Sequence, residues 1–424
     1  MGSFMKTHFF RYMAIALLLC PALPYAAAIN DNEDSLRIRL KNDFRRADKP
    51  SAGTGRDIYA WVQGGLIDVN TRYYADFIGV SAGAYYVYKL GAKDGWSTRY
   101  YLDGHDSFSV AIGALKLKPA DNLYLTLGRF GTDYGYGSLP YRIPLIADNS
   151  SRTIQTLSEG VLARFEATEN LTLWSMWRKR AFYYVDSATG VRDEGVIDTA
   201  TGNYYPRRAR TYLAGSWHDA SSRYSVGASY QPDVSTQIQS IFEKTHTFDD
   251  NRSLKWELMG FYGQVEGMSK PLSYHHDTAL VSGRLTYSFD NARLFGAIGK
   301  LTHDIDGRII YTDIGYPDSL SIDRNKENML SVQLGGQYFF NQNLGVMLGP
   351  VITRGYEDKQ RHTRIKGLGL MGGVMYNVTE GSFKGLNMYV AADRAREKRP
   401  GSALGDTLYY WDVKAGIQYD FMLK

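Results

Sequence analysis

Basic residues alternate with aliphatic ones in a short segment near the N-terminus of this 424-residue chain. The alternating residues are Leu36, Arg37, Ile38, Arg39, Leu40 and Lys41. Successive side chains of a β-strand point to opposite faces, so a strand here would carry three cations on one face and three aliphatic groups on the other. A row of cations along an aqueous wall offers successive weak sites to anionic groups, and multi-site binding supports flux through a pore.

Four more charged residues fall on the polar face of alternating segments: Arg164, Arg284, Asp412 and Lys414. Around Arg284, for example, Val281 and Leu285 lie on the opposite, apolar face. A cation that faces lipid at mid-bilayer costs roughly 2–4 kcal/mol, so a membrane setting would turn these side chains toward a lumen. Packing alone is the competing interpretation, because lumen arginines also pair with carboxylates.

A second basic group shares the parity of its apolar neighbours instead: Arg354, Arg364, Lys366, Arg394 and Arg396. Two interpretations remain open for these residues. A β-bulge could re-aim them toward the lumen, or they could lie above the membrane near the mouth of a pore.

The alternation is clearest in the segment Leu408–Phe421, where apolar and aromatic residues occupy the odd positions. A dozen residues with aromatics at both ends of the apolar face are typical of a transmembrane barrel strand. The ending resembles the C-terminal signal that the bacterial outer-membrane assembly machinery reads, with Gly416, Tyr419 and Phe421 as its expected residues. The pattern gives no interpretation of Met422–Lys424, which extends past the last aromatic residue.

Residues 1–28 have the pattern of a cleaved secretory signal peptide. Lys6 and Arg11 precede an apolar core, and small residues lead up to Ala28. Cleavage would remove Cys20, the single cysteine, and so exclude disulfides and thiol chemistry. A lipid anchor on Cys20 is the weaker alternative, because bulky Leu19 precedes it.

The composition points to a membrane barrel rather than a helical membrane protein. Charged residues make up 22% of the chain, and no stretch after the leader is apolar enough for a transmembrane helix. The 33 tyrosines suit the aromatic girdles at the two membrane interfaces. A net charge of +5 is too mild to indicate a nucleic-acid partner.

Alternating segments recur from Leu36–Asn42 to Leu408–Phe421 without an intervening linker, which predicts a single domain over residues 29–424. Their number, about 18, is an even count of the kind expected for a closed bacterial barrel. Short turns such as 167–170 alternate with long polar connections such as 303–327. We therefore expect an all-β fold, a transmembrane antiparallel β-barrel with periplasmic termini and a water-filled lumen.

The long connection at about residues 129–160 is the candidate for an inward-folded constriction loop. Its candidate residues are Tyr134, Tyr136, Arg142, Asp148, Arg152 and Glu159. Pro140 and Pro144 would stiffen the loop and reduce the entropy lost in fixing it. A surface loop over the mouth is the alternative.

Two segments resemble the OprD-type family of substrate-selective outer-membrane porins, which includes chitoporins. Trp61-Val62-Gln63-Gly64 is similar to that family's Trp-Ala-Gln-Gly segment, and the spacing from Arg152 to Gly160 resembles its constriction segment. The resemblance implies an 18-stranded monomeric channel that the third extracellular loop narrows. It also implies a basic ladder that guides carboxylate-bearing nutrients, and it places Asp148 and Arg152 in the constriction loop or its anchoring.

These patterns predict a porin in the outer membrane of a Gram-negative bacterium, without enzymatic activity, cofactor or metal. It would let small hydrophilic solutes diffuse passively and would favour carboxylate-bearing or other anionic nutrients. The other expected partners are outer-membrane lipid, lipopolysaccharide and the barrel-assembly machinery. A monomer is expected, and a trimer would use the same strand pattern.

Four alternatives remain open at the level of sequence. An oligosaccharide channel would stack sugars on aromatic side chains: Tyr85, Tyr124, Tyr134, Tyr136 and Tyr410. An outer-membrane enzyme could use the pair His105 and Ser107, and a metal site could use His275, His276, Asp277, His303 and Asp304. An adhesin or translocator would need a passenger domain or much longer loops.

Overall fold

The computed structural model of the chain describes residues 33–48, 57–91, 107–131, 143–146, 157–182, 192–193, 195–197, 204–206, 209–249, 251–304, 310, 316–317, 322, 324–358, 363–401 and 405–423. The predicted signal peptide, residues 1–28, lies outside these ranges. Within them, no helix is long and apolar enough to cross a membrane.

Eighteen of the described strands form one antiparallel barrel wall, as the alternating segments predict. They are β1 (Ser35–Asp48), β2 (Asp57–Asn70), β3 (Ile78–Lys89), β4 (Ser107–Ala120), β5 (Leu123–Gly131), β6 (Leu157–Thr168), β7 (Leu171–Phe182), β11 (Arg210–His218), β12 (Ser222–Gln231), β13 (Ser235–Asp249), β14 (Arg252–Val265), β15 (Asp277–Phe289), β16 (Ala292–Leu301), β17 (Glu327–Phe339), β18 (Leu344–Asp358), β19 (Thr363–Asn377), β20 (Asn387–Lys398) and β21 (Thr407–Leu423). Each strand pairs with its neighbours along the chain, and β7 pairs with β11.

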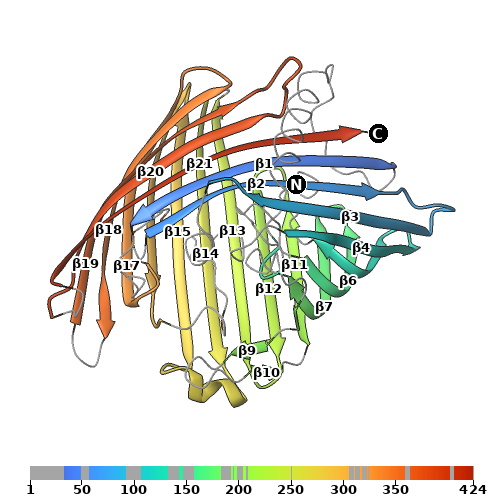
Figure 1. The fold of residues 1–424 in the computed structure, drawn as a ribbon, viewed down its shortest axis with the longest axis horizontal. Coiled ribbons are helices and arrows are strands. Elements are labelled where there is room, and N and C mark those ends of the chain that lie inside the picture. The colour runs from blue at the N-terminus through green and yellow to red at the C-terminus, as the bar shows by residue number, and fades with distance from the viewer. Residues whose placement is uncertain are drawn as a thin grey trace, which may run out of the picture.

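The barrel closes between its first and last strands, which lie side by side in Figure 1. Their register runs from Leu36 opposite Leu423 to Asp48 opposite Trp411. Closure satisfies the backbone groups that an open edge would expose to lipid. Met422 and Leu423 therefore have a structural role that the sequence pattern does not show, because they continue the last strand along β1.

Short and long connections separate at the two ends of the barrel. The turns 121–122, 169–170 and 290–291 lie at the end that holds the first residues of β1, whereas the connections 132–156 and 302–326 lie at the opposite end. Long loops mark the extracellular end of an outer-membrane barrel. Smaller elements also belong to this end: β8 (Arg192–Asp193), β9 (Gly195–Ile197), β10 (Tyr204–Pro206) and the 3₁₀-helix η5 (Gly267–Leu272).

The two faces of the wall differ as the alternation requires. Large apolar side chains such as Leu334, Val281 and Leu213 are 67%, 66% and 59% exposed on the outer face, where lipid would surround them. On the inner face, charged side chains such as Arg37 and Asp412 are buried against other lumen groups. The outer face is therefore suited to contact with the hydrocarbon of a bilayer.

The second basic group faces outward. Arg354, Arg364, Lys366, Arg394 and Arg396 are all exposed, whereas their sequence neighbours Ile365 and Ala395 are buried on the inner face. The β19–β20 pairing has no register shift, and the shift between β18 and β19 lies beyond Tyr356. The bulge interpretation is therefore wrong, and these cations lie at the extracellular ends of their strands.

Candidate functional site: the barrel lumen

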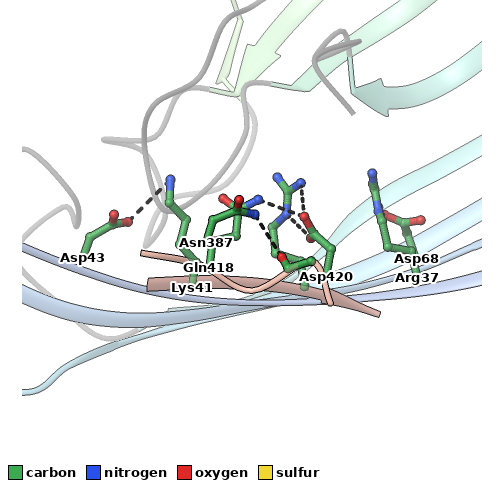
Figure 2. A network of polar contacts seen from close by, with 9 residues as sticks. Arg37, Lys41, Asp43, Asp68, Asn387, Gln418 and Asp420 are labelled. Atoms are coloured by element: carbon green, nitrogen blue, oxygen red, sulfur yellow. Dashed lines mark hydrogen bonds and ion pairs between the residues drawn. The ribbon is translucent and has the colours of Figure 1, made fainter. Parts of the chain in front are cut away.

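The predicted row of cations lies on the inner wall at the seam where the barrel closes. Arg37 donates from Nε to a carboxylate oxygen of Asp68 on β2 at 2.9 Å. Arg39 donates from Nη2 to Asp420 on β21 at 3.0 Å. Figure 2 shows Arg37, Asp68 and Asp420 along this wall. Each of these two arginines thus has a carboxylate partner on the neighbouring strand.

Farther along β1, the next two cations also lie beside aspartates, one on the same strand and one on β21. Lys41 Nζ lies 3.6 Å from Asp43, and Arg45 donates to both carboxylate oxygens of Asp412 at 3.1 and 2.6 Å. Lys414, the remaining seam residue predicted from sequence, lies directly opposite Arg45 in the register. Asp43, Arg45, Asp68 and Asp420 were not among the residues predicted for the site, although all four have the inward parity of their strands.

The opposite wall carries a larger ion network across β12 to β15. Glu257 accepts hydrogen bonds from Arg284 at 2.7 Å and from Lys255 at 3.0 Å. Lys255 also donates to Glu243 at 3.2 Å, and Arg223 donates to the same carboxylate at 2.8 Å. Three cations thus share two carboxylates on one stretch of the lumen. Arg284 was predicted to face the lumen, and the structure places it in this network.

Arg164 lies in a second inner cluster near the periplasmic end. Its guanidinium lies 4.1 Å from the centroid of the Tyr124 ring and 3.4 Å from Glu166. The Tyr124 ring contacts Tyr73, over which the Lys116 ammonium sits at 4.7 Å. Cation–π contacts of this kind stabilise the packing of the wall.

Part of the predicted constriction loop enters the lumen. Ile143 and Ile146 are 1% and 2% exposed, and they pack with inward-facing Trp174 and Tyr212 of β7 and β11. The backbone N–H of Leu145 donates to the Gln239 side chain on β13 at 3.2 Å. The segment 143–146 therefore packs against the inner wall, as the constriction hypothesis requires.

The other loop candidates have different outcomes. Tyr134, Tyr136, Arg142, Asp148 and Arg152 lie outside the described residues. Glu159 belongs to β6 instead of the loop, and it pairs with Arg129 at 3.2 Å and Arg180 at 3.0 Å. The β5–β6 register places Glu159 on the same face as Val161, which is the outer one. Glu159 therefore does not belong to the inward loop segment, because it lies in the wall strand β6 and shares the outward parity of Val161.

Described residues of the connection 302–326 also reach into the barrel, which was not predicted from the sequence. Within 302–326, Ile310 is fully buried among inward-facing Met259 and Phe261 of β14. The Tyr316 hydroxyl donates to Glu257 at 2.8 Å, and its ring lies under the Arg284 guanidinium at 4.2 Å. The missed signal was the apolar and aromatic content of a loop that was classed as polar.

Of the tyrosines proposed for sugar stacking, Tyr85, Tyr124 and Tyr410 belong to the described part of the chain, and their rings are covered. Tyr85 and Tyr410 are 2% and 1% exposed within apolar clusters, and the Tyr410 hydroxyl donates to Glu397. The Tyr124 ring is covered by Arg164. These three tyrosines therefore pack the wall, and the structure does not support their role in a sugar path.

The alternative chemistries find little support. His105 lies outside the described residues, as does the side chain of Ser107. The imidazoles of His275 and His303 stack at 4.3 Å, and His275 Nε2 lies 2.8 Å from Glu327. In the described part of the chain, no group of three or more His, Cys, Asp or Glu side chains could hold a metal ion.

Solved structures with a similar fold define the class of barrel to which this chain is similar. The fold matches three solved structures: OccAB3 of Acinetobacter baumannii (TM-score 0.75, 16% identity, 92% of this chain and 99% of that one), OccK9 (OpdG) of Pseudomonas aeruginosa (0.74, 17%, 92% and 98%) and P. aeruginosa OpdK with vanillate (0.70, 16%, 92% and 99%). The chain is thus an outer-membrane β-barrel with the OprD/Occ channel fold, which confirms the predicted fold class, resemblance and location.

No family model matches the chain. It is 58% identical over 400 residues to the membrane-associated protein UidC of Escherichia coli (strain K12), an alignment that covers 94% of this chain and 95% of UidC. The chain belongs to the family of UidC.

Proposed function

We propose that this protein is a channel for passive diffusion of small hydrophilic solutes and that it favours anions, especially carboxylates. The observation that carries the proposal is the network on β12 to β15, where Arg223, Lys255 and Arg284 share the carboxylates of Glu243 and Glu257. An excess of cations on a confined, partly desolvated wall attracts anions more strongly than the same charges in water.

The two inward loop segments support a selective path over a wide open pore. Tyr316 contacts the ion network through Glu257, and the segment 143–146 lies on the inner wall from β7 and β11 to Gln239 of β13. Loops that narrow a lumen bring a passing solute within reach of the wall charges. OpdK, which shares the fold, has been solved with vanillate, an aromatic carboxylate.

The balance of charge differs between the two walls. At the seam, Asp43, Asp68, Asp412 and Asp420 pair with the four cations of β1, and the buried Asp393, directly opposite Asp412 on β20, adds a fifth carboxylate where Lys414 adds a fifth cation. Among the described residues, the network on β12 to β15 holds three cations and two carboxylates. We therefore place the stronger anion attraction on β12 to β15 and assign the seam cations chiefly to barrel closure.

Planar bilayers with the purified, folded protein test the proposal. We expect discrete conductance steps. Under a salt gradient, we expect a reversal potential whose sign shows that anions pass more readily than cations. Liposome swelling with amino acids, sugar acids and neutral chito-oligosaccharides then ranks the solute classes, with the acids fastest. A bilayer without conductance steps would refute the channel function, and faster entry of the neutral sugars would refute the anion preference.

A further inference from the structure

Six basic side chains face outward at the extracellular ends of three neighbouring strands. These residues, here called the basic collar, are Arg354 on β18, Arg364 and Lys366 on β19, and Arg394, Arg396 and Lys398 on β20. All six are exposed. The acids of β20, Asp393 and Glu397, are buried on the inner face and so do not lie among them.

The strand register brings the collar residues together. Arg354 lies directly opposite Lys366, and Lys366 lies directly opposite Lys398. Directly opposed side chains have Cβ atoms about 4.5–5.5 Å apart, and like charges at that spacing destabilise a sheet. Three cations in one row across three strands are therefore unfavourable unless anions lie between them.

The surroundings identify where such anions would come from. Toward the periplasm, the outward residues of the same strands become apolar: Ile352 is 58% exposed, Leu368 58% and Val390 51%. Tyr409 and Trp411 of β21 border the collar, and the Arg396 guanidinium lies 5.9 Å from the centroid of the Tyr409 ring. Aromatic residues mark the membrane interface, so the collar lies where the hydrocarbon of the outer leaflet ends.

We propose that the basic collar binds the phosphate groups of lipid A, the diphosphorylated glycolipid of the outer leaflet, with the acyl chains against the apolar surface below. Guanidinium and ammonium groups form strong charge-assisted hydrogen bonds with phosphate. Their long side chains can reach upward from a lipid-facing backbone to the headgroup level. This inference concerns the outer surface and does not rest on the proposed channel function.

A charge-removal variant and a matched control test the proposal. Arg364→Gln, Lys366→Gln and Arg396→Gln, combined, remove three collar charges. The control combines Arg72→Gln, Lys244→Gln and Lys384→Gln, exposed cations toward the periplasmic end. Native mass spectrometry of the full-length protein in detergent measures binding of diphosphorylated lipid A and of the same lipid with both phosphates removed.

We expect wild type and control to bind diphosphorylated lipid A equally and the collar variant to bind it at least about tenfold more weakly. Dephosphorylated lipid should bind weakly to all three proteins. Equal affinity of the collar variant and wild type would overturn the proposal, as would equal binding of the two lipids or an equal loss in the control.

Two further measurements keep the test decisive. Resistance to unfolding by detergent without heating reports that the variants are folded, independently of lipid binding and of channel function. A salt titration of wild type covers the case in which the triple variant fails to fold, because a phosphate site must weaken as salt rises. Lipid binding whose affinity does not change with salt would refute the assignment of the basic collar as a phosphate site.

Discussion

Arg45 and Asp412 form a two-point ion pair across the seam that joins the first and last strands, at 3.1 and 2.6 Å. Their side chains are 4% and 0% exposed, so the pair is screened from solvent. These residues are 367 positions apart in the chain. The pair can therefore form only when the barrel has closed, which links an electrostatic contact to completion of the fold.

Asp412→Ala should lower the free energy of unfolding by about 3–5 kcal/mol, because it leaves the buried Arg45 guanidinium without its carboxylate. The measurement is urea unfolding of the refolded protein in lipid vesicles. Asp34→Ala is the matched control, since it breaks the exposed pair with Arg72, whose side chains are 58% and 54% exposed. Exposed pairs contribute about 0–1 kcal/mol, and equal losses in the two variants would contradict the buried-pair assignment.

Arg223 and Glu243 should shift ion selectivity in opposite directions. Arg223→Gln removes a lumen cation and should move the reversal potential in a salt gradient toward cation preference. Glu243→Gln removes the carboxylate that Arg223 and Lys255 share, so it should increase anion preference. Glu243→Gln preserves the size of the side chain, whereas Arg223→Gln also shortens it, and shifts of the same sign would show that pore shape dominates over charge.

Tyr316 should control how far the connection 302–326 narrows the pore. Tyr316→Ala removes both the hydrogen bond to Glu257 and the ring beneath Arg284, so single-channel conductance should rise. Tyr316→Phe keeps the ring and loses only the hydroxyl, so its conductance should stay closer to that of wild type. Equal conductance of wild type and the alanine variant would remove Tyr316 from the solute path.

The sequence predicts the barrel well because a transmembrane strand has a simple physical rule. Lipid on one side and water on the other impose an alternation of apolar and polar residues with a period of two. The direction in which residues such as Val281 and Arg284 point can therefore be inferred from side-chain chemistry alone. Closure between β1 and β21 follows from the cost of unpaired backbone in lipid. The extent of the last strand could not be predicted, because Met422 and Leu423 depend on the register with β1.

The site is harder to predict, since it depends on which side chains meet across strands. Parity placed Arg39 in the lumen, but its pairing with Asp420 requires the register of two strands at opposite ends of the chain. At Glu159 parity gives the outward direction, but the start of β6 at Leu157 could not be predicted, so the residue was assigned to the loop. Tyr316 belongs to a loop, and loops have no period from which a direction can be inferred.

Asp219 should make the periplasmic turn between β11 and β12 sensitive to acid. Its carboxylate accepts hydrogen bonds from the backbone N–H groups of Ser221 at 2.7 Å and Ser222 at 2.6 Å, and these bonds lower the pKa of Asp219. The folded state therefore gains stability above the ordinary aspartate pKa and loses it as the pH falls through the lowered value. Asp219→Asn should unfold at lower urea than wild type at neutral pH, and the difference should shrink on acidification; a constant difference would contradict this assignment.

Gly416 should be required because the Tyr389 ring covers it. The two residues are direct partners in the β20–β21 register, and a Cβ on Gly416 would overlap the ring. Gly416→Val should therefore lower the free energy of unfolding by about 1–3 kcal/mol, as overpacking does. Gly113→Ala is the control, because a Cβ there meets nothing within 4 Å, and it should change stability by no more than about 0.5 kcal/mol.

The same pair separates packing from assembly, since Gly416 was also predicted to belong to the C-terminal assembly signal. Tyr389→Ala removes the ring, so combining it with Gly416→Val should recover stability that the single valine variant loses, and the two changes should not be additive. Measuring the amount of folded barrel in the outer membrane alongside unfolding in vitro distinguishes the two roles. If the glycine only accommodates the ring, the double variant recovers both quantities. If the assembly machinery reads Gly416 directly, stability recovers while the amount of inserted barrel stays low.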